Sequence, residues 1–163
     1  PIAILITIKC GDVLPNFDKK DPLAIVYEND FHVSDGKTEC FMKIPENFFE
    51  EGVSFEEALK LIKPLMEDKD RNIVLWSKKA FKTKLYKYGL SFDSQIDDVS
   101  IEKYLVDFSG KDDSLSDVIK EYDLDETKPA TALLSLHSIM SDEKRGVNRL
   151  IQGLRTSALR RFI

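Results

Sequence analysis

The chain has 163 residues, of which 42% are hydrophobic and 33% charged, and it carries a net charge of −5. This length and composition are those of one globular domain that closes a single hydrophobic core without disulfide bridges. Two cysteines and two histidines exclude a disulfide scaffold, and their spacing fits no zinc finger. Because the sequence shows neither a membrane-spanning run nor a signal segment, we expect a cytoplasmic protein that does not bind membranes.

Charge is distributed unevenly along the chain. Residues 144–163 carry +6 and contain no acid, so the remainder of the chain carries −11. Residues 71–92 hold one arginine and five lysines, again without an acid, whereas residues 93–126 carry −9. The overall negative charge disfavours a dedicated nucleic-acid-binding protein. The basic segments could contact a phosphate backbone, although a solvated helix face is their ordinary interpretation.

Strand patterns occupy the first part of the chain. Short β-branched apolar runs at residues 1–9 and 23–27 predict buried strands. Residues 31–33 and 38–44 flank an Asp35-Gly36 pair, which is a strong signal for a hairpin. We therefore expect three or four strands in antiparallel succession, with Cys10 and Cys40 as small core residues near strand ends.

Helical patterns follow. Ser54 and Glu57 form a capping box before apolar residues at helical spacing, and Pro64 should kink or restart that helix. A short strand at residues 72–76 leads into a helix that Ser77 caps and Gly89 ends. Further helices are predicted to begin at Asp97 or Asp98, at Ser114, at Thr131 and, as a last amphipathic helix, at Val147.

An antiparallel meander followed by alternating helices and strands predicts an α/β fold, in which one mixed sheet is flanked by helices. This is the order of elements in the ribonuclease-H-like fold. We expect a single domain over residues 1–163, with a sheet–helix core at 1–140 and a terminal helix at 141–163. Because the chain starts at Pro1 rather than at methionine, we interpret it as a fragment of a longer chain.

Four sequence pieces between residues 56 and 122 carry a family resemblance. They are A-L-K-L-I-K-P-L-M-E-D at 58–68, Y-G-L at 88–90, I-D-D-V at 96–99 before Tyr104-Leu105, and the S-L-S-D-V helix at 114–118 with its Lys120-Glu121-Tyr122 end. In this order and spacing they resemble the 3′–5′ proofreading domain of bacterial family A DNA polymerases, the polymerase I type. The resemblance implies the ribonuclease-H-like (3′–5′ exonuclease) fold.

Active domains of this family hold two divalent metal ions between four carboxylates. The first strand offers Thr7-Ile8-Lys9 in place of the family's Asp-x-Glu, and Phe81 stands near the position of the next aspartate. At the position of the family's Tyr-x-x-x-Asp motif this sequence has His137 and Ser141, and Asp142 lies one position late. Because Mg²⁺ requires oxygen ligands and a lysine would repel it, we predict no catalytic residue, no metal ligand and no cofactor.

The predicted function is that of a vestigial, inactive 3′–5′ exonuclease-like domain, a scaffold in DNA replication and repair synthesis by a DNA polymerase I. Its partner would be the polymerase module of the same chain, and the domain itself would be a monomer. DNA would bind weakly, and the candidate contacts are Arg71, Lys78, Lys79 and Lys82. Two alternatives stay open: an active 3′–5′ exonuclease with displaced ligands, and a small α/β protein-interaction domain.

Overall fold

The computed structural model describes residues 6–9, 14–107 and 113–161, with the backbone alone for residues 6–9, 147 and 155–161. Within these ranges six strands form one sheet: β1 (Ile6–Lys9), β2 (Leu23–Tyr27), β3 (Phe31–Ser34), β4 (Thr38–Met42), β5 (Asn72–Leu75) and β6 (Gln95–Asp98). The helices are α1 (Phe55–Glu67), α2 (Lys78–Leu85), the short 3₁₀ helix η1 (Tyr86–Tyr88), α3 (Val99–Val106), α4 (Leu115–Glu121) and α5 (Pro129–Arg161).

The strand order in the sheet is β1-β4-β3-β2-β5-β6, which places β2 near the centre. The predicted antiparallel meander is present as β2, β3 and β4, and β5 and β6 continue the sheet in parallel with β2. β1 is not part of that succession, because it pairs in parallel with β4 at the outer edge. The two parallel strands are not consecutive in sequence, because β2 and β3 lie between β1 and β4 along the chain.

Two local predictions are also corrected. Residues 95–98, where no strand was predicted before the helix, form the edge strand β6, whose Q-I-D-D sequence carries no strand pattern. Cys40 is fully buried, as expected, but it is disulfide-bonded, whereas the sequence predicted no disulfide. Cys10 lies outside the described residues.

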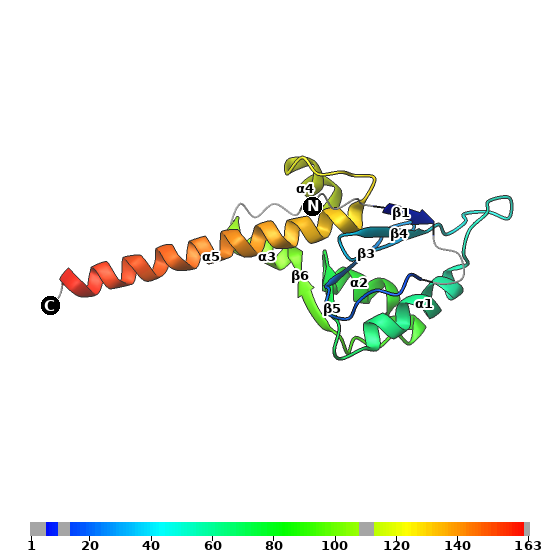
Figure 1. Ribbon diagram of the computed structural model, residues 1–163, viewed down its shortest axis with the longest axis horizontal. Helices are drawn as coiled ribbons and strands as arrows, with labels where there is room; N and C mark the ends of the chain where they lie inside the picture. Colours follow the sequence, from blue (N-terminus) through cyan, green and yellow to red (C-terminus); the bar gives the residue numbers. More distant parts are fainter. Residues whose placement is uncertain (1–5, 10–13, 108–112, 162–163) are drawn as a thin grey trace.

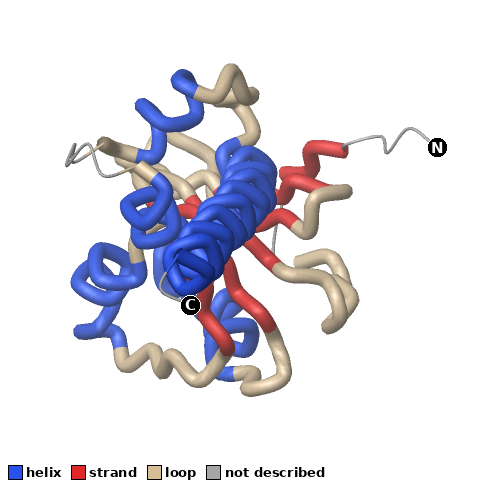
Figure 2. The backbone as a smooth tube through the Cα atoms, turned by 90° about the vertical axis from the view of Figure 1, so that its left-hand side faces the viewer, coloured by secondary structure: helices blue, strands red, loops and turns tan. Residues whose placement is uncertain are grey.

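Helices cover both faces of the sheet (Figures 1 and 2). Alternate residues of β2 point to opposite faces. On one face Ile25 belongs to a core that includes Ile62 of α1 and Leu85 of α2. On the other face Val26 belongs to a second core that includes residues of α4 and α5, among them Leu133. Burial on both faces explains why β2 is apolar throughout.

The capping signals in the sequence are confirmed. Ser54 accepts a hydrogen bond from the Glu57 N–H, the Glu57 side chain returns to the Ser54 N–H, and Ser77 caps α2. α1 nevertheless runs from Phe55 to Glu67 through Pro64 as one helix. The predicted helices at 131–140 and from 147 are likewise one helix of 33 residues, α5.

Only the first part of α5 packs on the sheet, and the rest projects away from the body (Figure 1). Among the side chains that the structure describes, Met140 is the last fully buried one of this helix. Leu150 and Leu154, further along, are 66% and 63% exposed. The projecting half therefore lacks tertiary support within the described part of the chain.

A buried carboxylate holds the start of α5 on the sheet. Glu39 of β4 is fully buried, and its Oε1 accepts a hydrogen bond from the Ala130 N–H at 3.0 Å. Its Oε2 accepts from the Thr131 N–H at 2.9 Å and from the Thr131 hydroxyl at 2.6 Å. The first N–H groups of a helix have no partner within the helix and form the positive end of its dipole. The Glu39 carboxylate therefore supplies both the acceptors for these N–H groups and a negative charge beside the positive end of the dipole.

Glu39→Ala should lower the free energy of unfolding by about 2–4 kcal/mol, because it leaves buried helix N–H groups without an acceptor. Urea denaturation followed by circular dichroism measures this loss. The exposed Glu51 provides a control, since Glu51→Ala should stay within about 0.5 kcal/mol of wild type. A Glu39→Ala protein as stable as this control would contradict the assigned role.

Hydrogen exchange should divide α5 into two parts. The amides of residues 133–140, which pack on the sheet, should be protected to a similar degree as those of β2. The amides of residues 148–154 should exchange orders of magnitude faster, because an unsupported helix is marginal in water. Equal protection along the whole helix would show that the projecting half is stabilised by contacts that this structure lacks.

Candidate functional site

The ends of β2 and β5 meet the helix that contains Phe81. Residues 25–28, at the end of β2, line one shallow groove together with Leu75 and Trp76 of the β5 end and with Phe81 of α2. β1 lies at the far edge of the sheet, beyond β4 and β3. The structure therefore places Val26-Tyr27-Glu28 at the end of β2, rather than Thr7-Ile8-Lys9 of β1, beside this groove.

The sequence does not show which of the two strands lies nearer the centre of the sheet. Both β1 and β2 are short apolar β-branched runs, and they differ in their pairing partners, which are distant in sequence. The strand near the centre, β2, is followed directly by one acid, Glu28.

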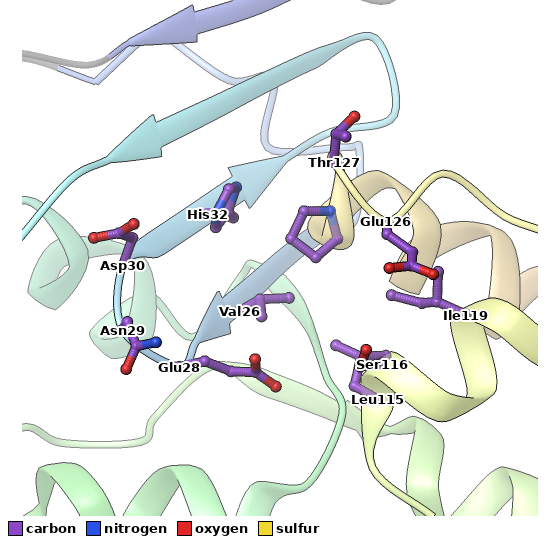
Figure 3. A pocket seen from close by; sticks show the side chains of 11 residues that line it. Val26, Glu28, Asn29, Asp30, His32, Leu115, Ser116, Ile119, Glu126 and Thr127 are labelled. Atoms are coloured by element: carbon purple, nitrogen blue, oxygen red, sulfur yellow. The ribbon is translucent and has the colours of Figure 1, made fainter.

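A pocket of about 290 Å³ adjoins this groove and shares Val26, Glu28 and Leu115 with it (Figure 3). Its walls come from β2 and the turn into β3, from α4, and from the segment that leads into α5. Three acids line it, Glu28, Asp30 and Glu126, whereas its described lining contains neither lysine nor arginine. The pocket is therefore acidic.

These acids do not converge as metal ligands. The Asp30 carboxylate accepts a hydrogen bond from the Ile44 N–H at 2.8 Å, which ties it to the chain after β4. Glu28 and Glu126 lie on opposite sides of the pocket (Figure 3). In the part of the chain that the structure describes, no group of three or more His, Cys, Asp or Glu side chains is placed to hold a metal ion. The donor set therefore does not fit a two-metal centre.

Phe81, near the position expected for a further carboxylate, belongs to the core. It is 6% exposed and meets the Phe92 ring edge-on at 6.1 Å. Beside it, burial and then the neighbouring Tyr88 raise the pKa of Tyr27, so that the phenol stays neutral at physiological pH. This wall of the groove is thus aromatic, with the Lys84 ammonium group 5.5 Å from the centre of the Tyr27 ring, and neither group is a ligand for a divalent cation.

The late-helix residues predicted near a third acidic motif lie elsewhere. His137 Nδ1 is 2.7 Å from Glu102 Oε1, and His137 Nε2 is 3.6 Å from Asp97 Oδ2, so this histidine joins α5 to α3 and β6. Ser141 lies beside Glu102 as well, and Asp142 is exposed. The acidic pocket is instead approached by Thr127 and Pro129, at the very start of α5. Residues 137–141 therefore do not line the acidic pocket.

The helix was predicted to begin at Asp97 or Asp98, and the structure shows that Asp98 is the cap. The Asp98 carboxylate accepts from the N–H groups of Ser100 and Ile101 and from the N–H of Lys78. Asp98 therefore fixes the starts of α3 and α2 relative to each other. The spacing of D-D-V before the helix fits either aspartate as the cap, and sequence alone could not decide between them.

The four predicted nucleic-acid contacts do not form one surface. Arg71 is 5% exposed, donates to the Phe17 carbonyl at 3.3 Å, and precedes β5 at the end opposite to α2. Lys78, Lys79 and Lys82 lie together on α2. Grouping Arg71 with the three lysines was therefore wrong, because the buried strand β5 separates Arg71 from α2. A DNA contact by the three lysines stays a prediction.

No protein-family model and no curated protein matches the chain. Solved structures of NrnC from Brucella melitensis do match. NrnC bound to pGG aligns with a TM-score of 0.55 at 14% identity, over 93% of this chain and 86% of NrnC. NrnC with bound Mg²⁺ gives a TM-score of 0.55 at 16% identity, over 91% and 86% of the two chains.

The likeness to NrnC shows the fold. NrnC has a ribonuclease-H-like 3′–5′ exonuclease fold, and the predicted fold class, a mixed sheet with a meander flanked by helices, is confirmed. Among the described residues, none of the helices is both long and apolar enough to cross a membrane.

Single-stranded DNA should bind weakly and lose affinity steeply with salt, because counterion release would drive the binding. Lys79→Ala combined with Lys82→Ala should flatten the slope of log K against log salt by about 1.4, at about 0.7 per phosphate contact. Fluorescence anisotropy measures the slope. A variant at a lysine on a different helix, Lys60→Ala on α1, should leave the slope unchanged. Binding that persists at high salt would contradict an electrostatic contact.

Proposed function

We propose that this chain is a catalytically inactive 3′–5′ exonuclease-like domain of a bacterial family A DNA polymerase, in which it serves as a structural scaffold. The resemblance of residues 56–122 to that family and the exonuclease fold support this assignment. The observation that carries it is the composition of the groove at the ends of β2 and β5. Val26 and Phe81 occupy positions where the two-metal mechanism needs carboxylates.

The charge of the adjoining pocket supports inactivity. Two-metal hydrolysis offsets the charge of a phosphodiester by placing cations between the enzyme's carboxylates and the phosphate. Here Glu28 and Glu126 face a pocket whose described lining holds neither lysine nor arginine, and no metal-binding cluster is present among the residues that the structure describes. An anionic strand entering this pocket would meet negative charge that nothing compensates.

The projecting half of α5 supports a scaffolding role. Ile151 and Leu154 follow Met140 by about three and four turns, so they continue the face that packs into the core. They are 45% and 63% exposed. An apolar face that continues a core face into solvent is suited to packing against a further module. We assign that module as the polymerase module of the same chain.

The exonuclease assay tests the proposal. The purified chain should leave 3′-labelled single-stranded DNA intact in Mg²⁺ and in Mn²⁺, over times in which an active proofreading domain degrades it completely. Degradation that co-purifies with the chain, and that Glu28→Gln abolishes, would favour the alternative of an active exonuclease with displaced ligands. Degradation that Glu28→Gln leaves unchanged would indicate a contaminating nuclease.

A gain of metal binding tests the assignment of β2. Val26→Asp creates an Asp-x-Glu pair with Glu28 on one face of β2, and calorimetry should then detect Mn²⁺ binding with a Kd of about 1 mM. The matched control is Lys9→Glu on the edge strand β1, which should bind no Mn²⁺. DNA should stay intact in both variants, since Phe81 still replaces a further ligand. Equal Mn²⁺ binding by both variants would contradict the assignment.

A further inference from the structure

Two neighbouring phenylalanines are the most exposed large apolar side chains among the described residues. Phe48 and Phe49 are 105% and 97% exposed. They lie in the loop of residues 43–53, between β4 and α1, which we call the phenylalanine loop. The loop extends from the end of the molecule opposite to the projecting half of α5 (Figure 1). A contact there would not compete with a module packed on α5.

The base of this loop is closed tightly. The Val53 N–H donates to the Lys43 carbonyl at 2.9 Å. Gly52 passes so close to the same carbonyl that a Cβ at this position would lie 2.4 Å from the oxygen. Only glycine fits this approach of two backbone segments.

The tip of the loop is also internally bonded. Asn47 Oδ1 accepts from the Phe49 N–H at 3.0 Å, and Glu50 Oε2 accepts from the Glu46 N–H at 3.1 Å. A loop fixed in this way presents its two rings with less conformational entropy to lose on binding. Exposed, preorganised aromatic side chains are typical of the centre of a binding surface.

Acids surround the two rings. Glu46 and Glu51 are exposed, and neither has a cationic partner within 4 Å among the described residues. Negative charge beside the rings disfavours insertion into an anionic membrane surface or against a phosphate backbone. It favours an apolar cavity whose rim is basic.

The chain itself carries such a cavity. A groove of about 420 Å³ between α2 and α3, which we call the lysine groove, is lined by Lys78, Lys79, Lys82, Thr83, Asp98 and Ile101. Lysine stems are aliphatic and can cover apolar surface while their ammonium groups stay in water. Ile101 is 56% exposed and contributes a further apolar wall.

The lysine groove carries a net positive charge that carboxylates of the described residues do not neutralise through ion pairs with the lysines. Asp98, its one acid, is already hydrogen-bonded to the Lys78 N–H at 3.0 Å and to the Ser100 hydroxyl at 2.6 Å. Within the described ranges, none of the three lysines has a carboxylate partner within 4 Å. The apolar surface and the positive charge of the lysine groove therefore complement the exposed rings and the acids of the phenylalanine loop.

We infer that the phenylalanine loop of one copy of this chain docks into the lysine groove of a second copy. Phe48 and Phe49 enter the groove beside Ile101, while Glu46 and Glu51 meet the lysines at its rim. Two reciprocal contacts around a two-fold axis would bury on the order of 600–1,000 Å² of phenylalanine surface. This is at the low end for specific interfaces, so the dimer is weak and the chain is monomeric when dilute.

Sedimentation velocity of the 163-residue chain, from about 10 μM to about 1 mM, covers the range in which an interface of this size dissociates. The weight-average sedimentation coefficient should rise with concentration. Phe48→Ser combined with Phe49→Ser should weaken the association at least tenfold. Tyr86→Ser is the matched control, because Tyr86 is an aromatic side chain that is 71% exposed outside both surfaces. It should associate like wild type.

A charge exchange locates the contact. Lys79→Glu should weaken the association severalfold, and adding Glu51→Lys should restore it, because the attractive pair is then re-formed with reversed signs. A wild-type chain that stays monomeric at all concentrations would overturn the inference. So would a phenylalanine-loop variant that associates like wild type, or a charge exchange that restores nothing. Single-stranded DNA that binds the lysines in a persistently monomeric chain would assign the groove to nucleic acid instead.

Discussion

The hydrogen bonding of Glu39 to the first turn of α5 determines where the other parts of the structure meet. Because the carboxylate fixes Ala130 and Thr131 over β4, the helix must cross the sheet and close the core that contains Val26 and Leu133. The same anchor brings Thr127 and Pro129 to the acidic pocket. It also directs the rest of the helix beyond the body of the domain (Figure 1). One buried acid thus sets a core, a pocket and a projecting surface.

The packing of the fold does not require carboxylates at the positions of Val26 and Phe81. Nothing in the sheet or in its two cores depends on an acid at the end of β2, since Val26 contributes to packing and Phe81 fills the opposite core. An aspartate at either place would cost burial energy unless a cation compensated it. The apolar side chains at these positions therefore contribute to the stability of the exonuclease-like fold, which is compatible with the proposed loss of a metal centre.

Local signals allowed much of the fold to be predicted, and long-range pairing accounts for most of what was missed. The Asp35-Gly36 hairpin and the caps at Ser54 and Ser77 depend on neighbouring residues, and all three are present. The edge position of β1 and the strand β6 depend on partners distant in sequence, which periodicity does not encode. In the site, the strand and cap before Phe81 could be predicted, and Phe81 lines the groove, whereas the positions of β1 and His137 away from the groove depend on long-range packing. The continuity of α5 across Gly146 was missed because glycine weakens a helix without necessarily ending it.

Paramagnetic broadening by Mn²⁺ in the two-dimensional NMR spectrum of the wild-type chain tests the loss of the metal centre most directly. A resident ion broadens amide signals near it beyond detection at equimolar amounts, whereas transient surface contacts broaden many signals slightly. We expect the amides of residues 26–28 and 127–131 to stay visible after an equimolar addition of Mn²⁺. Selective disappearance of these signals, with the remainder of the spectrum unchanged, would show an intact metal site at the end of β2 and contradict the proposed loss of the metal centre.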